Sequence, residues 1–351
     1  MKLDYFEVSK AHYCEYRDKI LDLRKNVFPE EDFLKMESIF WDWQFKENVY
    51  QDSQIFVVND LDTNQIIAHY ALVPYQMLLD GKLHLIGLAV DAMVHTNYRK
   101  MGICSKLQMY AIEHSRYYGT IGYTLRDEIK SIEKKGGYRC VKYIPVYIYP
   151  VNFRKIFKVF RNGTFEFLAP LAKIIYKAIF SNKVKSSIPF DIVDHIPHLI
   201  LEKYNIWLQQ IFKAYCPRDE KILKWRLSNE AGVDYSIYKY SAQSNIYFVT
   251  TVKEIQGLNA LNIVDIIFDK YSENDIATGL GRLIHKADKE QYDCISFFCA
   301  DNGSISKILR KSGLLKSPYL FQFIVHNSNS QLTYDLSHLN LFLTYFDTDL
   351  L

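Results

Sequence analysis

The chain has 351 residues, which is more than one hydrophobic core usually serves, so two domains are expected. Apolar residues make up 49% and charged residues 24% of it, as is typical of globular proteins. The net charge of +3 is too small to indicate nucleic-acid binding, which needs a clustered basic face. The N-terminal residues mix charged and apolar types unlike a signal peptide, so we expect a cytoplasmic protein.

The first half of the chain predicts alternating strands and helices. Hairpin turns are expected around Asp62 and at Asp80-Gly81, where turn-forming residues cluster. Together these patterns predict a mixed α/β sheet. The expected strands are 2–9, 53–60, 65–79, 84–95, 119–125 and 139–150, and the expected helices are 13–28, 31–46, 105–118 and 126–136.

The turn between residues 84–95 and 105–118 has the composition of an anion site. Residues 98–107 read YRKMGICSKL. A helix N-terminus presents unpaired N–H groups and the positive end of the helix dipole. Gly102 lets a ligand approach the backbone closely, while Arg99 and Lys100 add charge. The sequence therefore predicts a phosphate or pyrophosphate site here.

A weak internal repeat relates the two halves of the chain. Trp43 stands 12 residues before IFVV, as Trp225 stands 12 before IYKY. Asp91 precedes Tyr118 by 27 residues, as Asp265 precedes Tyr292. The repeat predicts two domains of one topology, at residues 1–150 and 188–351.

Residues 151–187 lie between these domains and are apolar but interrupted by lysine and arginine. A bilayer span needs about 20 nearly uncharged residues, so a transmembrane helix is not expected. One hypothesis is a connecting helix whose apolar face packs between the domains. The other is a basic amphipathic segment that makes a peripheral contact with a membrane surface.

Residues 99–104, RKMGIC, resemble the R/Q-x-x-G-x-G/A signature of the GNAT superfamily of acetyl-CoA-dependent N-acyltransferases. Cys104 stands where that signature has glycine or alanine. Residues 90–107 resemble the tandem GNAT proteins linked to bacterial surface-polysaccharide biosynthesis, and residues 219–238 resemble their second domain. The resemblance implies a twisted mixed sheet with helices on both faces in each domain.

The same resemblance implies acetyl-CoA as the donor. Its pantetheine arm would lie between the fourth and fifth strands, and its pyrophosphate would lie on the glycine-containing turn. Arg126 stands where many relatives have an asparagine near the pantetheine arm. The implied cofactor-binding residues are Ala92, Met93, Val94, Arg99, Lys100, Met101, Gly102, Ile103, Cys104, Ser105 and Arg126.

The second copy lacks the features that would bind pyrophosphate. Counting from Asp265 as from Asp91 places Glu273 at the position of Arg99 and Ile276 at that of Gly102. Acidic residues would repel pyrophosphate, so we expect the second domain to be a degenerate GNAT copy. It would bind no CoA and would cap the acceptor pocket.

Three residues are candidates for the chemistry of acyl transfer, which needs a free amine, an oxyanion partner and a proton for the thiolate. Asp91 is the candidate base, although Asp265 at the same place in the second copy favours a structural role. Tyr123 and Tyr138 are the candidate acids. In the resemblance, the oxyanion would meet a backbone N–H near Met93.

At the C-terminus, Asp347 and Asp349 are either a solvated acidic tail or an extension that returns to the active site.

The leading function hypothesis is an N-acetyltransferase acting on a small-molecule amine, with an amino sugar as one acceptor that the resemblance implies. No metal is expected, since the six cysteines show neither C-x-x-C spacing nor histidine companions and should be reduced and mostly buried. One alternative is a non-catalytic CoA-binding or structural module. The other is a FemABX-like aminoacyl transferase, which would bind tRNA.

Overall fold

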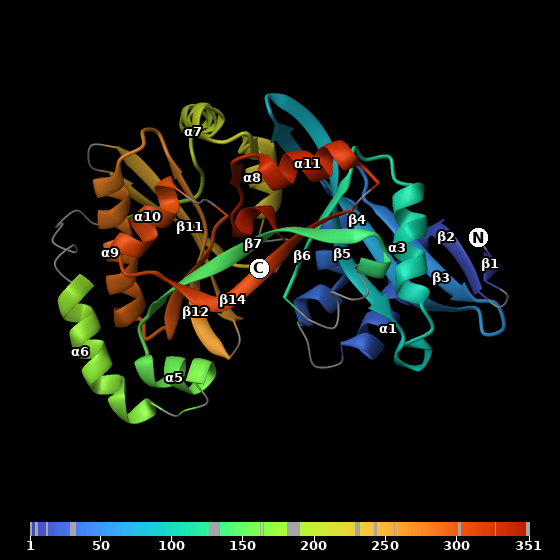
Figure 1. The fold of residues 1–351 in the computed structure, drawn as a ribbon, viewed down its shortest axis with the longest axis horizontal. Helices are drawn as coiled ribbons and strands as arrows, with labels where there is room; N and C mark the ends of the chain where they lie inside the picture. The colour runs from blue at the N-terminus through green and yellow to red at the C-terminus, as the bar shows by residue number, and fades with distance from the viewer. Residues whose placement is uncertain are drawn as a thin grey trace. The chain divides into compact units, whose positions relative to one another are not determined.

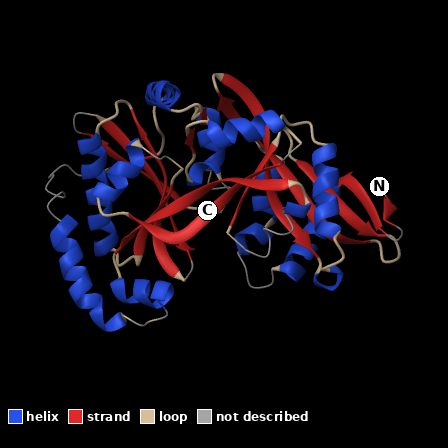
Figure 2. Ribbon diagram, in the orientation of Figure 1, coloured by secondary structure: helices blue, strands red, loops and turns tan. Residues whose placement is uncertain are grey.

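The structure is a computed structural model of the chain. It describes every residue except 1, 4–5, 12, 29–32, 126–133, 162, 164, 181–189, 229–231, 242–243, 256, 301–302, 327 and 349–351. Strands form the centre of the fold and helices cover them (Figures 1 and 2). The chain divides into two compact units, and both are discontinuous in sequence. The first comprises Met1–Tyr143, Lys221–Gly232 and Gln322–Leu339, and the second comprises Ile144–Glu220, Val233–Phe321 and Asn340–Leu351.

These units differ from the contiguous domains that the sequence predicts, because two strands belong partly to each unit. β7 (Tyr138–Pro150) begins in the first unit and ends in the second, and β14 (Leu315–His326) runs the other way. In the first unit β14 pairs with β6 (Thr120–Thr124). In the second unit β7 pairs with β13 (Cys294–Phe298). Each sheet therefore takes one strand from a distant part of the sequence, which local patterns cannot indicate.

The sheet of the first unit runs in the order β1-β2-β3-β4-β5-β6-β14. Neighbouring strands are antiparallel, except that β5 and β6 are parallel. The long β4–β5 hairpin turns at Asp80 and Gly81, as predicted, and both residues have positive φ. The remaining strands are β1 (Lys2–Leu3), β2 (Phe6–Ala11), β3 (Gln54–Asp60), β4 (Gln65–Leu79) and β5 (Lys82–Val94).

Helices cover both faces of this sheet. Because side chains alternate along a strand, His69 and Tyr70 of β4 point to opposite faces. His69 contacts Trp41 of α2, whereas Tyr70 packs in a buried cluster with Ile103 of α3. The helices of the unit are α1 (Tyr13–Val27), α2 (Ser38–Phe45), α3 (Ile103–Glu113), α8 (Glu220–Arg226), of which Glu220 belongs to the second unit, and α11 (Ser330–His338).

The sheet of the second unit repeats this order with β7-β13-β12-β11-β10-β8. Along this path β12 and β13 are parallel and the other neighbouring strands are antiparallel, and β9 and β15 form a further parallel pair off the path. Its other strands are β8 (Asp191–Val193), β9 (Ala214–Tyr215), β10 (Tyr235–Ser241), β11 (Asn245–Ile255), β12 (Leu258–Phe268) and β15 (Leu341–Phe342). Its helices are α5 (Phe153–Arg161), α6 (Ala169–Phe180), α7 (His198–Ile211), α9 (Glu273–Lys289) and α10 (Ser304–Lys311), with short turns η3 (Glu166–Leu168) and η6 (Tyr345–Asp347).

The two tryptophans that suggested the repeat contact each other inside the first unit. Trp43 Nε1 donates to the carbonyl of Trp225 at 2.7 Å, and Trp225 Nε1 donates to the carbonyl of Trp43 at 2.9 Å. Their rings stack at 5.0 Å, and both side chains are buried. The reciprocal contact agrees with equivalent positions in two copies of one topology.

Residues 151–187 do not form a separate connecting element. α5 and α6, the described helices of this segment, belong to the second unit. Within that unit the large apolar side chains of α6 are exposed. No helix in the described parts of the chain is long and apolar enough to cross a membrane.

Five of the described cysteines are thiols outside any disulfide. Cys216, Cys294 and Cys299 are buried, whereas Cys140 is exposed and Cys104 is partly so. Within the described ranges, no group of three or more histidine, cysteine, aspartate or glutamate residues could hold a metal ion.

Candidate acyl-CoA site

An opening lies between the parallel strands β5 and β6 of the first unit. The two strands pair at Gly87 with Thr120 and at Leu88 with Ile121. Beyond Leu88, the register pairs β5 with β4 alone among the described strands. The far side of residues 89–94 therefore presents backbone edge that an extended ligand can add to.

A bulge in β5 lies beside this opening. The β4–β5 register shifts between His69, which faces Met93, and Ala71, which faces Val90. Asp91 therefore falls in the bulge, and its φ of 51° is one that non-glycine residues rarely adopt. Ala92 has no partner in this register. A bulge leaves its extra residue outside the ladder and bends the strand.

Strand alternation identifies which backbone groups face β4. The His95 N–H donates to the Ile67 carbonyl at 2.8 Å. In an antiparallel ladder, every second residue exchanges such bonds with the partner strand, so the polar groups of Met93 also point to β4. Those of Val94 point to the opening. The N–H of Met93 therefore points to β4 and away from the opening, where the resemblance to the GNAT superfamily implies that the oxyanion would lie.

A buried ion pair holds the bulge. Arg24 of α1 donates from Nη1 to Asp91 Oδ1 at 2.8 Å, with both side chains more than nine-tenths buried. Burial disfavours the charged carboxylate, but the positive charges of Arg24 and Lys35 outweigh it and lower the pKa of Asp91. A carboxylate that is already paired and has a lowered pKa is a weak base.

His69 supports the same bulge from β4. Its Nδ1 lies 2.8 Å from the Asp91 carbonyl oxygen, so the Nδ1–H donates and Nε2 is the acceptor nitrogen. Burial lowers the pKa of His69 to about 4, so the ring is neutral at pH 7. Among the described residues, Nε2 has no hydrogen-bond partner.

The turn after β5 has the geometry of an anion site. Gly102 is the N-cap of α3 with φ 76°, and as a glycine it supplies no side-chain cap of its own. A Cβ on Gly102 would meet nothing within 4 Å, so the turn is open. Lys100 also has positive φ, at 68°. Arg99, Lys100 and Met101 are exposed, whereas Ile103 is buried and anchors the helix to the core.

The candidate acids differ in their surroundings. Tyr123 lies near the C-terminal end of β6, the neighbour of the opening, and its ring stacks on Phe323 at 5.3 Å. Tyr138 is buried, and its hydroxyl lies 2.5 Å from that of Tyr70. Arg126 lies outside the described residues. Of the predicted residues, Asp91 to Val94 and the turn 99–105 thus follow one another at one end of β5, Tyr123 lies on the neighbouring strand β6, and Tyr138 is buried.

The second unit has an equivalent opening, but its own chain fills it. β12 and β13 pair from Ala260–Ile263 with Cys294–Phe297, and β12 bulges opposite Val249 and Thr250. The Cys299 N–H bonds to Pro145 of β7, so the N–H of Ala300 points the other way, towards β12. There it donates to the Leu343 carbonyl at 2.9 Å. Leu343 and Thr344 of the C-terminal segment, residues 341–348, thus pair with Ala300 and Cys299, directly after β13, on the side that faces β12.

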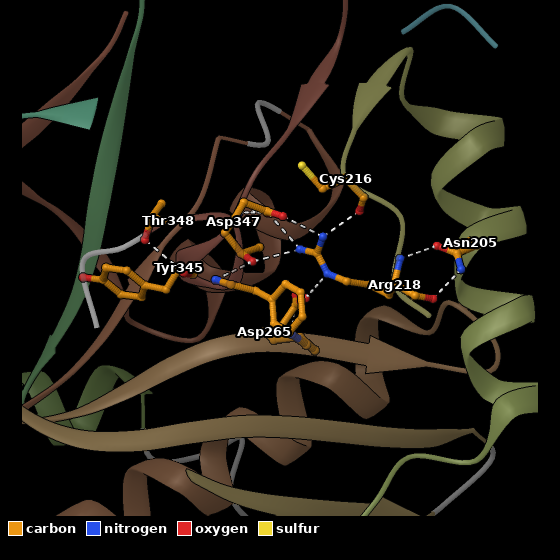
Figure 3. Close-up of polar contacts among 10 residues, drawn as sticks. Asn205, Cys216, Arg218, Asp265, Tyr345, Asp347 and Thr348 are labelled. Atoms are coloured by element: carbon orange, nitrogen blue, oxygen red, sulfur yellow. Dashed lines mark hydrogen bonds and ion pairs between the residues drawn. The ribbon is translucent and has the colours of Figure 1, made fainter. Parts of the chain in front are cut away.

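Arg218 fixes this segment with an extensive buried network (Figure 3). Its Nε donates to Asp265 of β12 at 2.6 Å. Its Nη1 and Nη2 donate to the two carboxylate oxygens of Asp347 at 2.7 and 2.9 Å. Burial raises the pKa of Asp265 although Arg218 opposes it. Asp347 is therefore a structural partner of Arg218 rather than part of a solvated tail, and Asp349 lies outside the described residues.

The helix N-termini of the two units also differ. Ser272 caps α9, since its side chain accepts from the Asp275 N–H at 3.3 Å. Glu273 forms ion pairs with Lys307 and Lys311. In the second unit the first turn of the helix is thus already supplied with negative charge by the chain itself.

Comparison with known proteins agrees with this geometry. Residues 12–123 match the model of the Acetyltransferase (GNAT) domain. The first unit carries a GNAT acyltransferase domain. A search of curated proteins gave no match.

Solved structures extend the likeness in fold to both units. A GCN5-related N-acetyltransferase from Anabaena variabilis has 13% identity and a TM-score of 0.60, over 91% of this chain and 72% of that one. Saccharomyces cerevisiae N-myristoyltransferase with bound myristoyl-CoA has 10% identity and a TM-score of 0.60, over 93% and 84%. A probable N-acyltransferase from Enterococcus faecalis has 12% identity and a TM-score of 0.58, over 91% and 71%.

Residues 12–123 thus form a GNAT-type acyltransferase domain, and an acyl-CoA donor is typical of this fold. Sequence reasoning missed two residues of the GNAT domain that hold the bulge, Arg24 and His69. Arg24 looks like any basic residue near the end of a helix. The signal for His69 was a lone histidine in an apolar strand, which is more often structural.

Proposed function

We propose that the first unit transfers an acetyl group from acetyl-CoA to a small-molecule amine. One observation carries this proposal: the Gly102 turn and the unpaired edge of β5 lie at the same end of one strand. A pyrophosphate on the turn would leave the pantetheine arm to extend along that edge. An amino sugar is the acceptor that we favour within this class.

Two backbone positions would serve the donor. The polar groups of Val94 would bind the amide groups of the arm, as a neighbouring strand would. The N–H of Ala92, which has no cross-strand partner, would donate to the oxyanion of the tetrahedral intermediate. The bulge makes this N–H available.

We assign Asp91 a positioning role, because Arg24 occupies its carboxylate and lowers its pKa. The attacking amine would then lose its proton to water or to a group on the acceptor side. We assign Tyr123 as the acid for the leaving thiolate, since it lies on β6 beside the opening. The buried hydrogen bond between Tyr138 and Tyr70 supports a structural role for Tyr138.

Calorimetric titration with acetyl-CoA and a free-thiol assay over a panel of amines and amino sugars test the proposal. Gly102→Glu places a carboxylate at the N-terminus of α3 and should weaken acetyl-CoA binding at least about thirtyfold, or about 2 kcal/mol. Gly81→Glu is the matched control. Gly81 has φ 82° and open space like Gly102, but it lies in the β4–β5 turn.

Two results would overturn the proposal. One is the absence of acetyl-CoA binding by the wild-type protein. The other is an equal loss in the two glycine variants. Binding without thiol release for any amine would instead support a non-catalytic CoA-binding module.

A further inference from the structure

Helix α6 of the second unit exposes its apolar side chains instead of burying them. Its lysines reach towards α9 although their side chains stay 42% and 45% exposed: Lys173 and Lys177 pair with Asp288 at 3.3 and 2.7 Å. The Tyr176 hydroxyl donates to the Gly313 carbonyl. A helix on a solvated surface normally buries its apolar face and exposes its lysines. Here the ion pairs orient the helix with its apolar face outward.

Exposed apolar side chains gather on α6 and on the residues just before it. Of the 22 large apolar side chains that are exposed in the described parts of the chain, seven lie between residues 165 and 179. Phe167 is 77% exposed, Ile174 67% and Ile179 61%. Contiguous exposed surfaces of this kind mark interaction sites. The seven residues, called the apolar face below, are Phe165, Phe167, Leu168, Leu171, Ile174, Ile175 and Ile179.

The segment that carries the apolar face is strongly basic. Residues 153–180 contain six lysines and arginines and a single acidic residue, Glu166. Arg154 and Lys158 of α5 are exposed. α5, η3 and α6 contact one another, and Figure 1 shows α5 and α6 in pale green at one margin of their unit. Basic and apolar groups therefore share one helical layer.

Packing beneath α6 is incomplete. A cavity of about 170 Å³ lies between α6 and α9 and is lined by Phe153, Phe180 and Ile284, together with both lysines of α6. The helix is thus held by its polar contacts and only partly by apolar packing. Its larger apolar surface is on the outer side.

We propose that the layer formed by α5, η3 and α6 docks on the surface of a membrane rich in anionic lipids. The apolar face would enter the boundary between headgroups and acyl chains, while Arg154 and Lys158 would bind lipid phosphates. A second copy of the chain fits less well, because two basic layers would repel each other.

Vesicle flotation of the full chain tests this inference without reference to activity. The vesicles are pure phosphatidylcholine or phosphatidylcholine with about 30% phosphatidylglycerol, each at low and high salt. We expect flotation with the anionic vesicles and weaker binding at high salt. Ile174→Glu with Ile175→Glu should lower the partition coefficient by more than about tenfold.

The matched control is Leu199→Glu with Ile206→Glu on α7, where both side chains are similarly exposed. This variant should float like the wild type, and the thermal unfolding of both variants should be unchanged. Arg154→Glu with Lys158→Glu should abolish the preference for anionic vesicles.

Three outcomes would overturn the inference. The first is no flotation of the wild type with any vesicle. The second is equal flotation of the Ile174→Glu, Ile175→Glu variant and of the control variant on α7. The third is a dimer in light scattering that Ile174→Glu with Ile175→Glu dissociates, while the wild type binds no vesicles. The last outcome would assign the apolar face to a second copy of the chain.

Discussion

The two units contain the same pair of parallel strands, open in the first and filled in the second. β5 and β6 separate beyond Leu88, and the register gives the far side of β5 no described strand as a partner. β12 and β13 separate in the same way, but there Leu343 and Thr344 pair with the residues that directly follow β13. In the second unit the chain itself thus lies at the place that corresponds to the open edge of β5 in the first.

The charges around the two openings differ accordingly. In the first unit, one ion pair between Arg24 and Asp91 holds the bulge and leaves the opening accessible. In the second, Arg218 binds one carboxylate of the strand and one of the inserted segment. In the second unit the chain thus supplies its own pairing segment and its own helix cap, where the first unit has an open strand edge and a glycine at the helix N-cap.

The largest effect should come from removing the arginine that closes the second unit. Arg218→Met leaves the carboxylates of Asp265 and Asp347 buried without a counter-ion, and should lower the free energy of unfolding by about 3–5 kcal/mol. Urea denaturation measures this loss. Arg24→Met should cost less, since it leaves one carboxylate unpaired. A loss below about 1 kcal/mol for Arg218→Met would contradict the role of the network. Asp347→Asn, which keeps the shape, gives a second measurement.

The next effect is a pH dependence that originates at the bulge of the first unit. In the unfolded state His69 binds a proton below about pH 6.5. In the folded state the pKa of His69 is about 4, so its ring binds a proton only near that pH. The free energy of unfolding should therefore fall as the pH falls from 6.5 to 4, by about 3 kcal/mol.

His69→Asn should remove this part of the pH dependence in urea midpoints. His114→Asn is the control, because His114 makes a similar Nδ1 contact with a carbonyl but is exposed. Equal slopes for the wild type and His69→Asn would show that His69 does not titrate as stated.

A smaller effect distinguishes positioning from catalysis at Asp91. If Asp91 holds the bulge, Asp91→Asn and Arg24→Met should both weaken acetyl-CoA binding about tenfold and lower transfer in parallel. If Asp91 is the base, Asp91→Asn should abolish transfer and leave donor binding unchanged. Calorimetry combined with thiol release separates these results.

The smallest effect is expected from an attempt to create a pyrophosphate-binding turn at the start of α9 in the second unit. Ser272→Gly with Glu273→Lys removes the cap and the negative charge at the start of α9. We expect no second acetyl-CoA site, because residues 341–348 still fill the gap. Calorimetric stoichiometry measures it. A second equivalent of bound acetyl-CoA would show that the helix cap alone separates the two units.

Local sequence determined the strand, turn and helix around Gly102, because the order of apolar periodicity, glycine and basic residues is written within about 25 residues. It also located the repeat and the acidic replacement of the turn in the second copy. The hairpin at Asp80-Gly81 followed from turn chemistry alone.

Only the tertiary structure decided which groups these elements meet. Arg24 and Asp91 are 67 residues apart, and Arg218 and Asp347 are 129 apart. The pairing of β7 with β13, that of β14 with β6, and the contacts of residues 341–348 beside the end of β13 likewise join distant segments. Periodicity reports which side of a strand is apolar, but it carries no information on which distant backbone lies beside that strand. The pairing of distant segments leaves the edge of β5 open in the first unit and fills the corresponding gap in the second.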